Sequence, residues 1–199
     1  LVGSEMCIRD RGIDIPDISG LKSAYEISRE NEGCISALLS ADKLSGFINS
    51  FVSAMAEPIF FFIELPCTAD EEKALGGKYK LYYLDNCTKP VIAAIMKTYG
   101  TLLINDGVCR FGFGGNESGD ELYVQSYKVM SIYCSNAKLK AKTEELLKKA
   151  GAEKTAELLT PWDILSEENG GVCVRAEQDG VSLFDLPELL KDAGMYSAG

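Results

Sequence analysis

The 199-residue sequence contains no histidine, and this absence excludes several classes of catalytic site. A Ser-His-Asp triad, a Cys-His dyad, an H-E-x-x-H zinc site and a histidine-ligated haem all require an imidazole. Covalent chemistry without histidine would depend on a lysine base or on a cysteine with a lowered pKa. We find no motif for catalysis and none for a cofactor, so the composition leans away from an enzyme.

Long hydrophobic runs are also missing. The densest apolar segment, Pro58–Pro66, is interrupted by Glu64 and is far shorter than the roughly 20 residues that a membrane-spanning helix needs. The overall composition is 46% hydrophobic and 25% charged, which is typical of a globular domain. We therefore expect a soluble protein with no membrane partner.

The cysteines lack the spacing of a metal site or a disulfide scaffold. No C-x-x-C pair occurs, and apart from Cys7 the six cysteines are far apart and mostly lie in apolar runs. We expect buried free thiols and hence a cytoplasmic location. Cys67 precedes a predicted helix, whose dipole would favour a thiolate, but the acidic residues at 70–72 oppose this effect. We interpret Cys67 as structural.

Positive charge is scarce as well. The chain has 20 Lys and Arg against 30 Asp and Glu, a net charge of −10. This balance argues against nucleic-acid binding, which requires clustered cations for phosphate contacts. The lysines between 138 and 149 alternate with Glu144 and Glu145, so we interpret them as a solvated helix face. An acidic surface favours solubility and would steer the protein toward a basic partner.

The first eleven residues, LVGSEMCIRDR, have neither a helical nor a strand period. Translation of a transposase-type sequencing adapter gives Leu1–Asp10, and its leftover bases allow only Ser or Arg at the next position, where Arg11 stands. We therefore interpret residues 1–11 as a translated adapter that is not native. Residues 12–199 are expected to form a single α+β domain truncated at its N-terminus.

Apolar periodicity predicts three main helices. The first follows Ser40 and ends before Pro58, the second begins near Thr88 and closes at Asn105, and the third covers about 137–150. A weaker helical turn is expected over 153–159. A final helix is expected from Asp185 to Gly194, because the sequence DLPE combines an acidic N-cap with an early proline and a capping-box glutamate.

The predicted strands alternate irregularly with these helices. They cover 34–39, 59–65, 79–84, 108–114 and 121–134, the last with a break near Gln125-Ser126, and a hairpin joins 172–176 to 181–184. The run IFFFIEL at 59–65 predicts a strand buried on both faces. Because strict β-α alternation fails, we expect an α+β fold with a mixed or antiparallel sheet covered by amphipathic helices, and a C-terminal β-hairpin and helix.

One contiguous core is expected from the apolar faces of these elements. Its predicted members are Phe47, Phe51, Met55, Phe60, Phe62, Ile92, Ile95, Tyr99, Leu102, Phe111, Leu146 and Leu147.

The segment FGFGGNESGDE, 111–121, is the best candidate for a binding loop. It lacks the sixth-position glycine of a dinucleotide fingerprint and the lysine of a P-loop, and it does not match a calcium loop. We interpret it as a hairpin turn, with a partner-binding loop and then a metal site as alternatives. Its candidate partner-binding residues are Glu117, Asp120 and Glu121.

These observations favour an acidic binding protein, of an inhibitor- or immunity-like kind, whose partner is a basic protein. Two alternatives remain open. One is an enzyme with carboxylate-based chemistry that needs no histidine, which a pocket with convergent carboxylates would support. The other is a regulatory domain of a longer chain.

Overall fold

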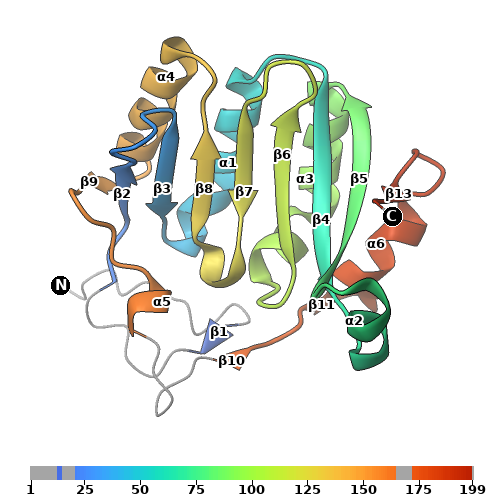
Figure 1. Ribbon diagram of the computed structural model, residues 1–199. Helices are drawn as coiled ribbons and strands as arrows, with labels where there is room; N and C mark the ends of the chain where they lie inside the picture. Colours follow the sequence, from blue (N-terminus) through green and yellow to red (C-terminus); the bar gives the residue numbers. More distant parts are fainter. Residues whose placement is uncertain (1–12, 15–20, 165–171, 199) are drawn as a thin grey trace.

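The computed structural model describes residues 13–14, 21–164 and 172–198, so the interpretation of residues 1–11 lies outside the described chain. In this part a nine-stranded mixed sheet has helices against one of its faces (Figure 1). The expected α+β class is confirmed, as are the C-terminal hairpin and short helix.

Neighbouring strands of the main sheet run antiparallel, except for one parallel pair at an edge, β2 with β9. The spatial order is β13 (Tyr196–Ser197), β5 (Tyr79–Cys87), β4 (Ile59–Pro66), β6 (Arg110–Gly115), β7 (Glu121–Val124), β8 (Met130–Tyr133), β3 (Cys34–Leu38), β2 (Ala24–Ile27) and β9 (Glu153–Lys154). A 3₁₀ turn at Ser126–Lys128 separates β7 from β8, which confirms the expected break.

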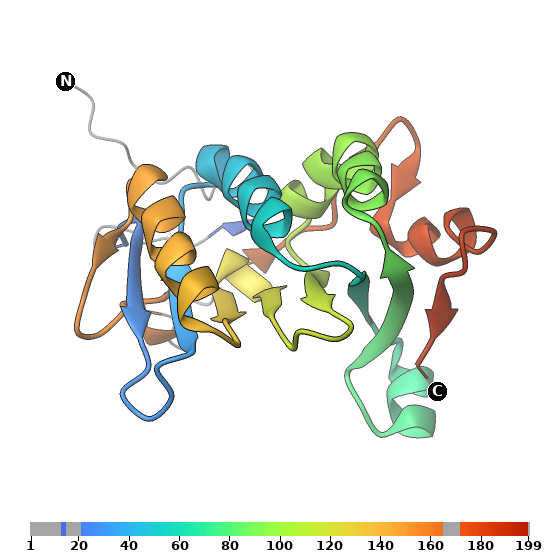
Figure 2. The ribbon, with the colours of Figure 1, turned by 90° about the horizontal axis from the view of Figure 1, so that it is seen from above.

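The three longest described helices are α1 (Ala41–Ala54), α3 (Lys89–Asn105) and α4 (Ala137–Lys149). They lie on the same side of the sheet, and α1 packs between the other two (Figure 2). Pro90 occupies the first turn of α3, where its missing N–H has no helical acceptor to lose. Shorter helices are α2 (Ala69–Leu75), α5 (Pro161–Ile164) and α6 (Leu186–Leu189).

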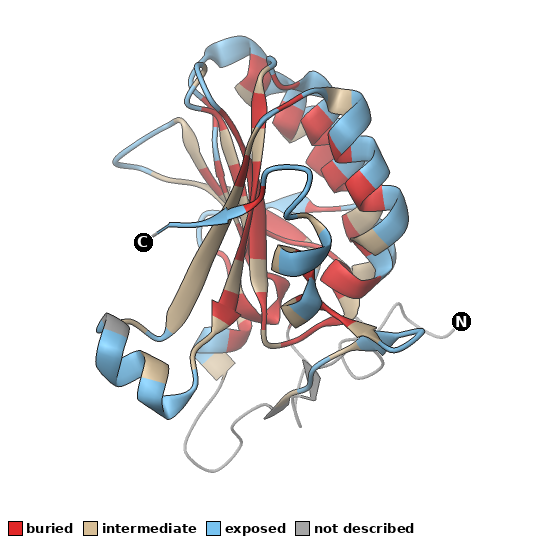
Figure 3. Cartoon of the chain, turned by 90° about the vertical axis from the view of Figure 1, so that its right-hand side faces the viewer, coloured by how far each residue is buried: buried red, intermediate tan, exposed pale blue. Residues whose placement is uncertain are grey.

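The main core lies between the sheet and this helix layer, where buried residues line the facing surfaces (Figure 3). Strand register places a row of apolar side chains on the helix side of the sheet: Ile35, Ile132, Leu122, Phe113 and Phe61. Phe51 and Ile92 pack against them from the helices. Each such side chain contributes about 1.5–3 kcal/mol on burial, so this interface is the principal source of stability.

Two members of the predicted core lie elsewhere. Phe60 and Phe62 point to the face opposite the helices, where Phe62 is buried and Phe60 is half-buried, so the expectation that β4 is buried on both faces holds only in part. A smaller apolar cluster also lies on that opposite face, beneath the segment that follows β9. It consists of Leu21, Ala24, Leu38, Val129 and Leu158, with Ile164 against it.

Three local expectations are corrected by the structure. Residues 153–154 form strand β9 rather than a helical turn, because they pair with β2. The last helix, α6, ends at Leu189, and the turns after it bring β13 back to the sheet edge. The hairpin turn at Asp179-Gly180 is confirmed, but its strands are β11 (Glu177–Gln178) and β12 (Val181–Ser182), whereas β10 (Val172–Cys173) pairs with β1 (Ile13–Asp14).

Candidate functional site

The face of the sheet opposite the helices carries a belt of aromatic rings. Register places five of the chain's nine tyrosines there, together with Phe60 and Phe62. Ring centroids along the belt are 5.5–6.2 Å apart, from Tyr196 through Tyr83 and the two phenylalanines to Tyr123. We call this surface the open face. Its residues are Phe60, Phe62, Glu64, Tyr79, Tyr83, Arg110, Glu121, Tyr123, Tyr133 and Tyr196.

Two glycines in β6 make room for these rings. The sequence RFGFGG alternates, so that Phe111 and Phe113 enter the core while Gly112 and Gly114 lie under the open face. A β-carbon on Gly112 would fall 2.4 Å from Cζ of Phe62, and one on Gly114 would fall 2.1 Å from Cζ of Phe60. The phenylalanine rings therefore occupy the space that side chains on β6 would fill.

A polar network holds one end of the belt in place. Tyr123 donates a 2.7 Å hydrogen bond to Glu64, whose carboxylate also lies 3.6 Å from the Arg110 guanidinium. Arg110 in turn lies over the Tyr79 ring, 4.0 Å from its centroid, and donates to Ser126. Burial, aided by the bond to Glu64, raises the pKa of Tyr123 to about 12, so this phenol stays protonated.

Negative charge predominates on the open side of the sheet. Among the described strand residues, register places Glu26, Glu64, Glu121 and Glu153 on this side, and Arg110 is the one cation. Asp85, in an irregular part of β5, accepts hydrogen bonds from Tyr196 and Asn116.

The centre of the belt lies in the field of several of these carboxylates. Burial raises the pKa of the Tyr83 phenol, and three carboxylates raise it further. They belong to Glu121, Glu64 and Asp85, in decreasing order of effect. The potential over the rings is therefore negative, which suits a cation.

The three residues singled out from the sequence have different roles. Glu117 is exposed in the turn between β6 and β7. Asp120 is buried and accepts hydrogen bonds from the Ser135 amide at 2.8 Å and hydroxyl at 2.7 Å, so its carboxylate holds the turn in place. Glu121 is half-buried on the open face. The aromatic belt itself was missed, although the alternation in RFGFGG was a usable signal.

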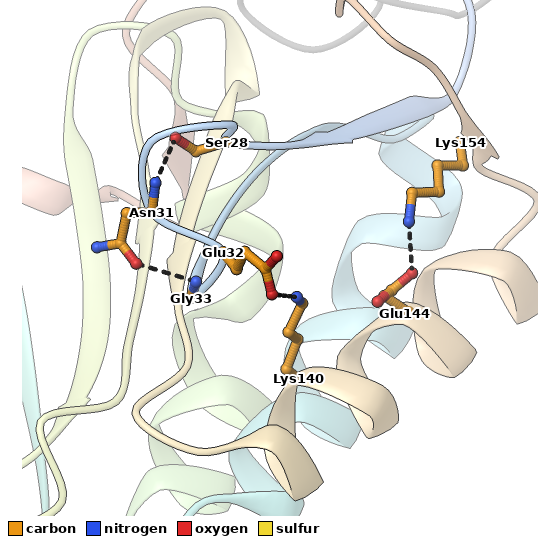
Figure 4. A network of polar contacts seen from close by, with 7 residues as sticks. All are labelled: Ser28, Asn31, Glu32, Gly33, Lys140, Glu144 and Lys154. Carbon is orange, nitrogen blue, oxygen red and sulfur yellow. Dashed lines mark hydrogen bonds and ion pairs between the residues drawn. The ribbon is translucent and has the colours of Figure 1, made fainter.

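Positive charge is concentrated in the helix layer. Helices α1, α3 and α4 carry eight lysines against three acidic residues, a net charge of +5; since the chain totals −10, the rest carries −15. On α4, Lys140 pairs with Glu32 in the β2–β3 turn, and Glu144 pairs with Lys154 of β9 (Figure 4). Part of the lysine cluster therefore ties α4 to the sheet.

A buried lysine at the end of α3 is structural. Lys128 donates to the carbonyl oxygens of Leu103 at 3.0 Å and Asp106 at 2.5 Å, at the end of α3. Burial lowers its pKa to about 8, although Asp106 opposes this shift. Tyr127 and Lys128 both have positive φ, a strained conformation that directs the lysine inward.

Burial shields three of the cysteines in the described chain. All six that lie in it are free thiols, and Cys87, Cys109 and Cys134 are buried. Burial raises the pKa of each of these three, which suppresses the thiolate. Cys67 is partly exposed at the end of β4, beside the capped helix α2.

Other kinds of site find little support in the described residues. A groove of about 420 Å³ between α1 and α3 contains no carboxylate; it is lined by Ser45, Asn49, Val52, Ser53, Lys89, Ile92, Ala93, Met96 and Lys97. Within residues 13–14, 21–164 and 172–198, no three metal-binding side chains converge. No described helix is both long and apolar enough to cross a bilayer.

Comparisons with models of protein families, with curated proteins and with solved structures find no match to this chain.

Proposed function

We propose that this protein binds a basic protein partner through its open face. The observation that carries the proposal is the combination of aromatic rings with carboxylates on one surface. Arg110, the one cation that register places on this side among the described strand residues, is already paired with Glu64. Lysine and arginine side chains of a partner would gain both cation–π contacts and ion pairs there. A nucleic acid would meet repulsion from the same carboxylates.

A carboxylate-based enzyme is the less favoured alternative, for a physical reason. An enzyme with carboxylate chemistry needs two carboxyl groups converging on a substrate pocket, and the groove between α1 and α3 has none. On the open face, Glu64 is engaged by Arg110 and Tyr123. We therefore favour binding, of the kind by which an inhibitor or immunity protein neutralises a basic protein.

Site-specific photocrosslinking tests this proposal. Tyr133 on β8 and Val91 on α3 are both 41% exposed, but they lie on the open face and the helix layer respectively. A photoreactive phenylalanine analogue at Tyr133 should capture a basic protein from the source cell, and the same analogue at Val91 should not. The yield should fall between low and physiological salt, because the Debye length shrinks to about 8 Å.

Several outcomes would contradict the proposal. They are no adduct at low salt, equal yields from the two positions, an acidic or nucleic-acid partner, and an adduct between two copies of this chain. A yield that is insensitive to salt would also count against it, because steering by the carboxylates would then be unimportant.

A further inference from the structure

The protein already contains one complete arginine site on its open face. The guanidinium of Arg110 lies over the Tyr79 ring, 4.0 Å from its centroid, and its Nη1 is 3.6 Å from the Glu64 carboxylate. An arginine is thus held by an aromatic surface and a carboxylate together. The planar guanidinium suits this arrangement because it can stack and donate hydrogen bonds at the same time.

A second combination of a carboxylate and aromatic rings on the same face is paired with no cation of the described residues. Glu121 begins β7 and stands opposite Tyr133 on one side and Gly114 on the other. The Phe60 ring lies over Gly114. Glu121 therefore has an aromatic residue on each side, Phe60 toward β6 and Tyr133 on β8. Within the described chain, Glu121 forms no side-chain hydrogen bond or ion pair that would compensate its partial burial.

We propose that Glu121, with the rings of Phe60 and Tyr133, forms a subsite for an arginine side chain of the partner. This inference rests on the proposed function and specifies its chemistry. A lysine ammonium could pair with the Glu121 carboxylate, but it is more strongly hydrated and cannot stack as a plane on the rings. The subsite should therefore prefer arginine to lysine at equal charge.

A pair of defined peptides tests this preference. Fluorescence anisotropy at low salt would compare a nine-residue oligoarginine with a nine-residue oligolysine. The wild-type protein should bind oligoarginine about fivefold more tightly. Glu121→Gln should remove most of this preference. Glu117→Gln, which removes the same charge from the exposed turn, should weaken both peptides equally and by less than about twofold.

The fold of the variant can be checked independently. Glu121→Gln should not lower the urea midpoint, because the carboxylate that it replaces has no described ion pair to lose. The inference is refuted if the wild type shows no preference for arginine, or if Glu121→Gln preserves the preference. If the preference for arginine is absent but both peptides bind and Tyr133→Ser weakens both, only the arginine subsite is refuted and the proposed function survives. If neither peptide binds at low salt, both proposals are wrong.

Discussion

Replacing Gly112 by alanine should destabilise the fold, whereas the same replacement at Gly46 should stabilise it. A β-carbon on Gly112 would lie 2.5 Å from the carbonyl oxygen of Leu122, about 1 Å inside an ordinary contact. Leu122 belongs to the neighbouring strand β7, so β6 and β7 would have to separate to relieve this clash. Overpacking of this kind costs about 1–3 kcal/mol, and we expect the upper end because backbone must move.

Two matched variants calibrate this estimate. At Gly114 the clash is with the Phe60 ring, which is only partly buried and can rotate outward, so Gly114→Ala should cost about 1 kcal/mol. At Gly46, in the middle of α1, a β-carbon meets nothing within 4 Å. Alanine there should add about 0.5–1 kcal/mol, because glycine is a poor helix former.

Urea unfolding of the three variants would give the free-energy differences directly. Thermal unfolding should show the same order, since 1 kcal/mol shifts the midpoint of a domain of this size by about 2–4 °C. A Gly112→Ala variant as stable as the wild type would refute the close packing of β6 against Leu122 and the open-face rings. Equal losses of stability in Gly112→Ala and Gly114→Ala would refute the expectation that a clash with backbone costs more than a clash with a ring that can rotate.

Three further predictions follow from buried polar groups. Asp120→Ala should lower the free energy of unfolding by about 2–3 kcal/mol, because the Ser135 donors lose a charged acceptor. Glu117→Ala should change the free energy of unfolding by less than about 0.5 kcal/mol. Equal effects of the two variants in urea unfolding would contradict this prediction. Because burial lowers the pKa of Lys128 from 10.5 to about 8, the unfolded chain holds more protons between these pH values. The stability of the wild type relative to Lys128→Met should therefore rise from pH 8 to 10.5, and a difference independent of pH would exclude a buried amine. Ellman's reagent should react slowly in the native protein, and rapidly in denaturant, with the buried thiols of Cys87, Cys109 and Cys134. Fast reaction of these thiols in the native protein would show that they are not buried.

Sequence patterns predicted the elements whose signals are local. Helix α3 begins and ends where Pro90 and the Asn105-Asp106-Gly107 turn indicate, and the break after β7 follows from a change in side-chain parity. Strand β9 was missed because two residues acquire strand geometry only by pairing with β2. The end of the last helix was misjudged because Gly194 lies beyond several turns that have no distinctive residue signal.

The open face could not be derived from one segment. A continuous apolar run such as IFFFIEL is compatible with a strand covered by helices on both sides and with one covered on a single side. The difference arises on β6, where glycines let Phe60 and Phe62 lie on the sheet. Glu121 was identified as a candidate from its acidic turn, but its aromatic neighbours come from β4 and β8, which only tertiary pairing brings together.

The segregation of charge also bears on which partner can reach the open face. The helix layer, at +5, is itself complementary to the open face, so two copies of this chain could in principle associate head to tail. At long range, however, each copy carries −10, and approach of two copies is opposed by their net charges before the local attraction acts. A basic protein meets the reverse situation, because net charge attracts it and the helix layer repels it. The chain's overall acidity would therefore disfavour self-association, and under the proposed function the lysines of the helix layer would direct a basic partner to the open face.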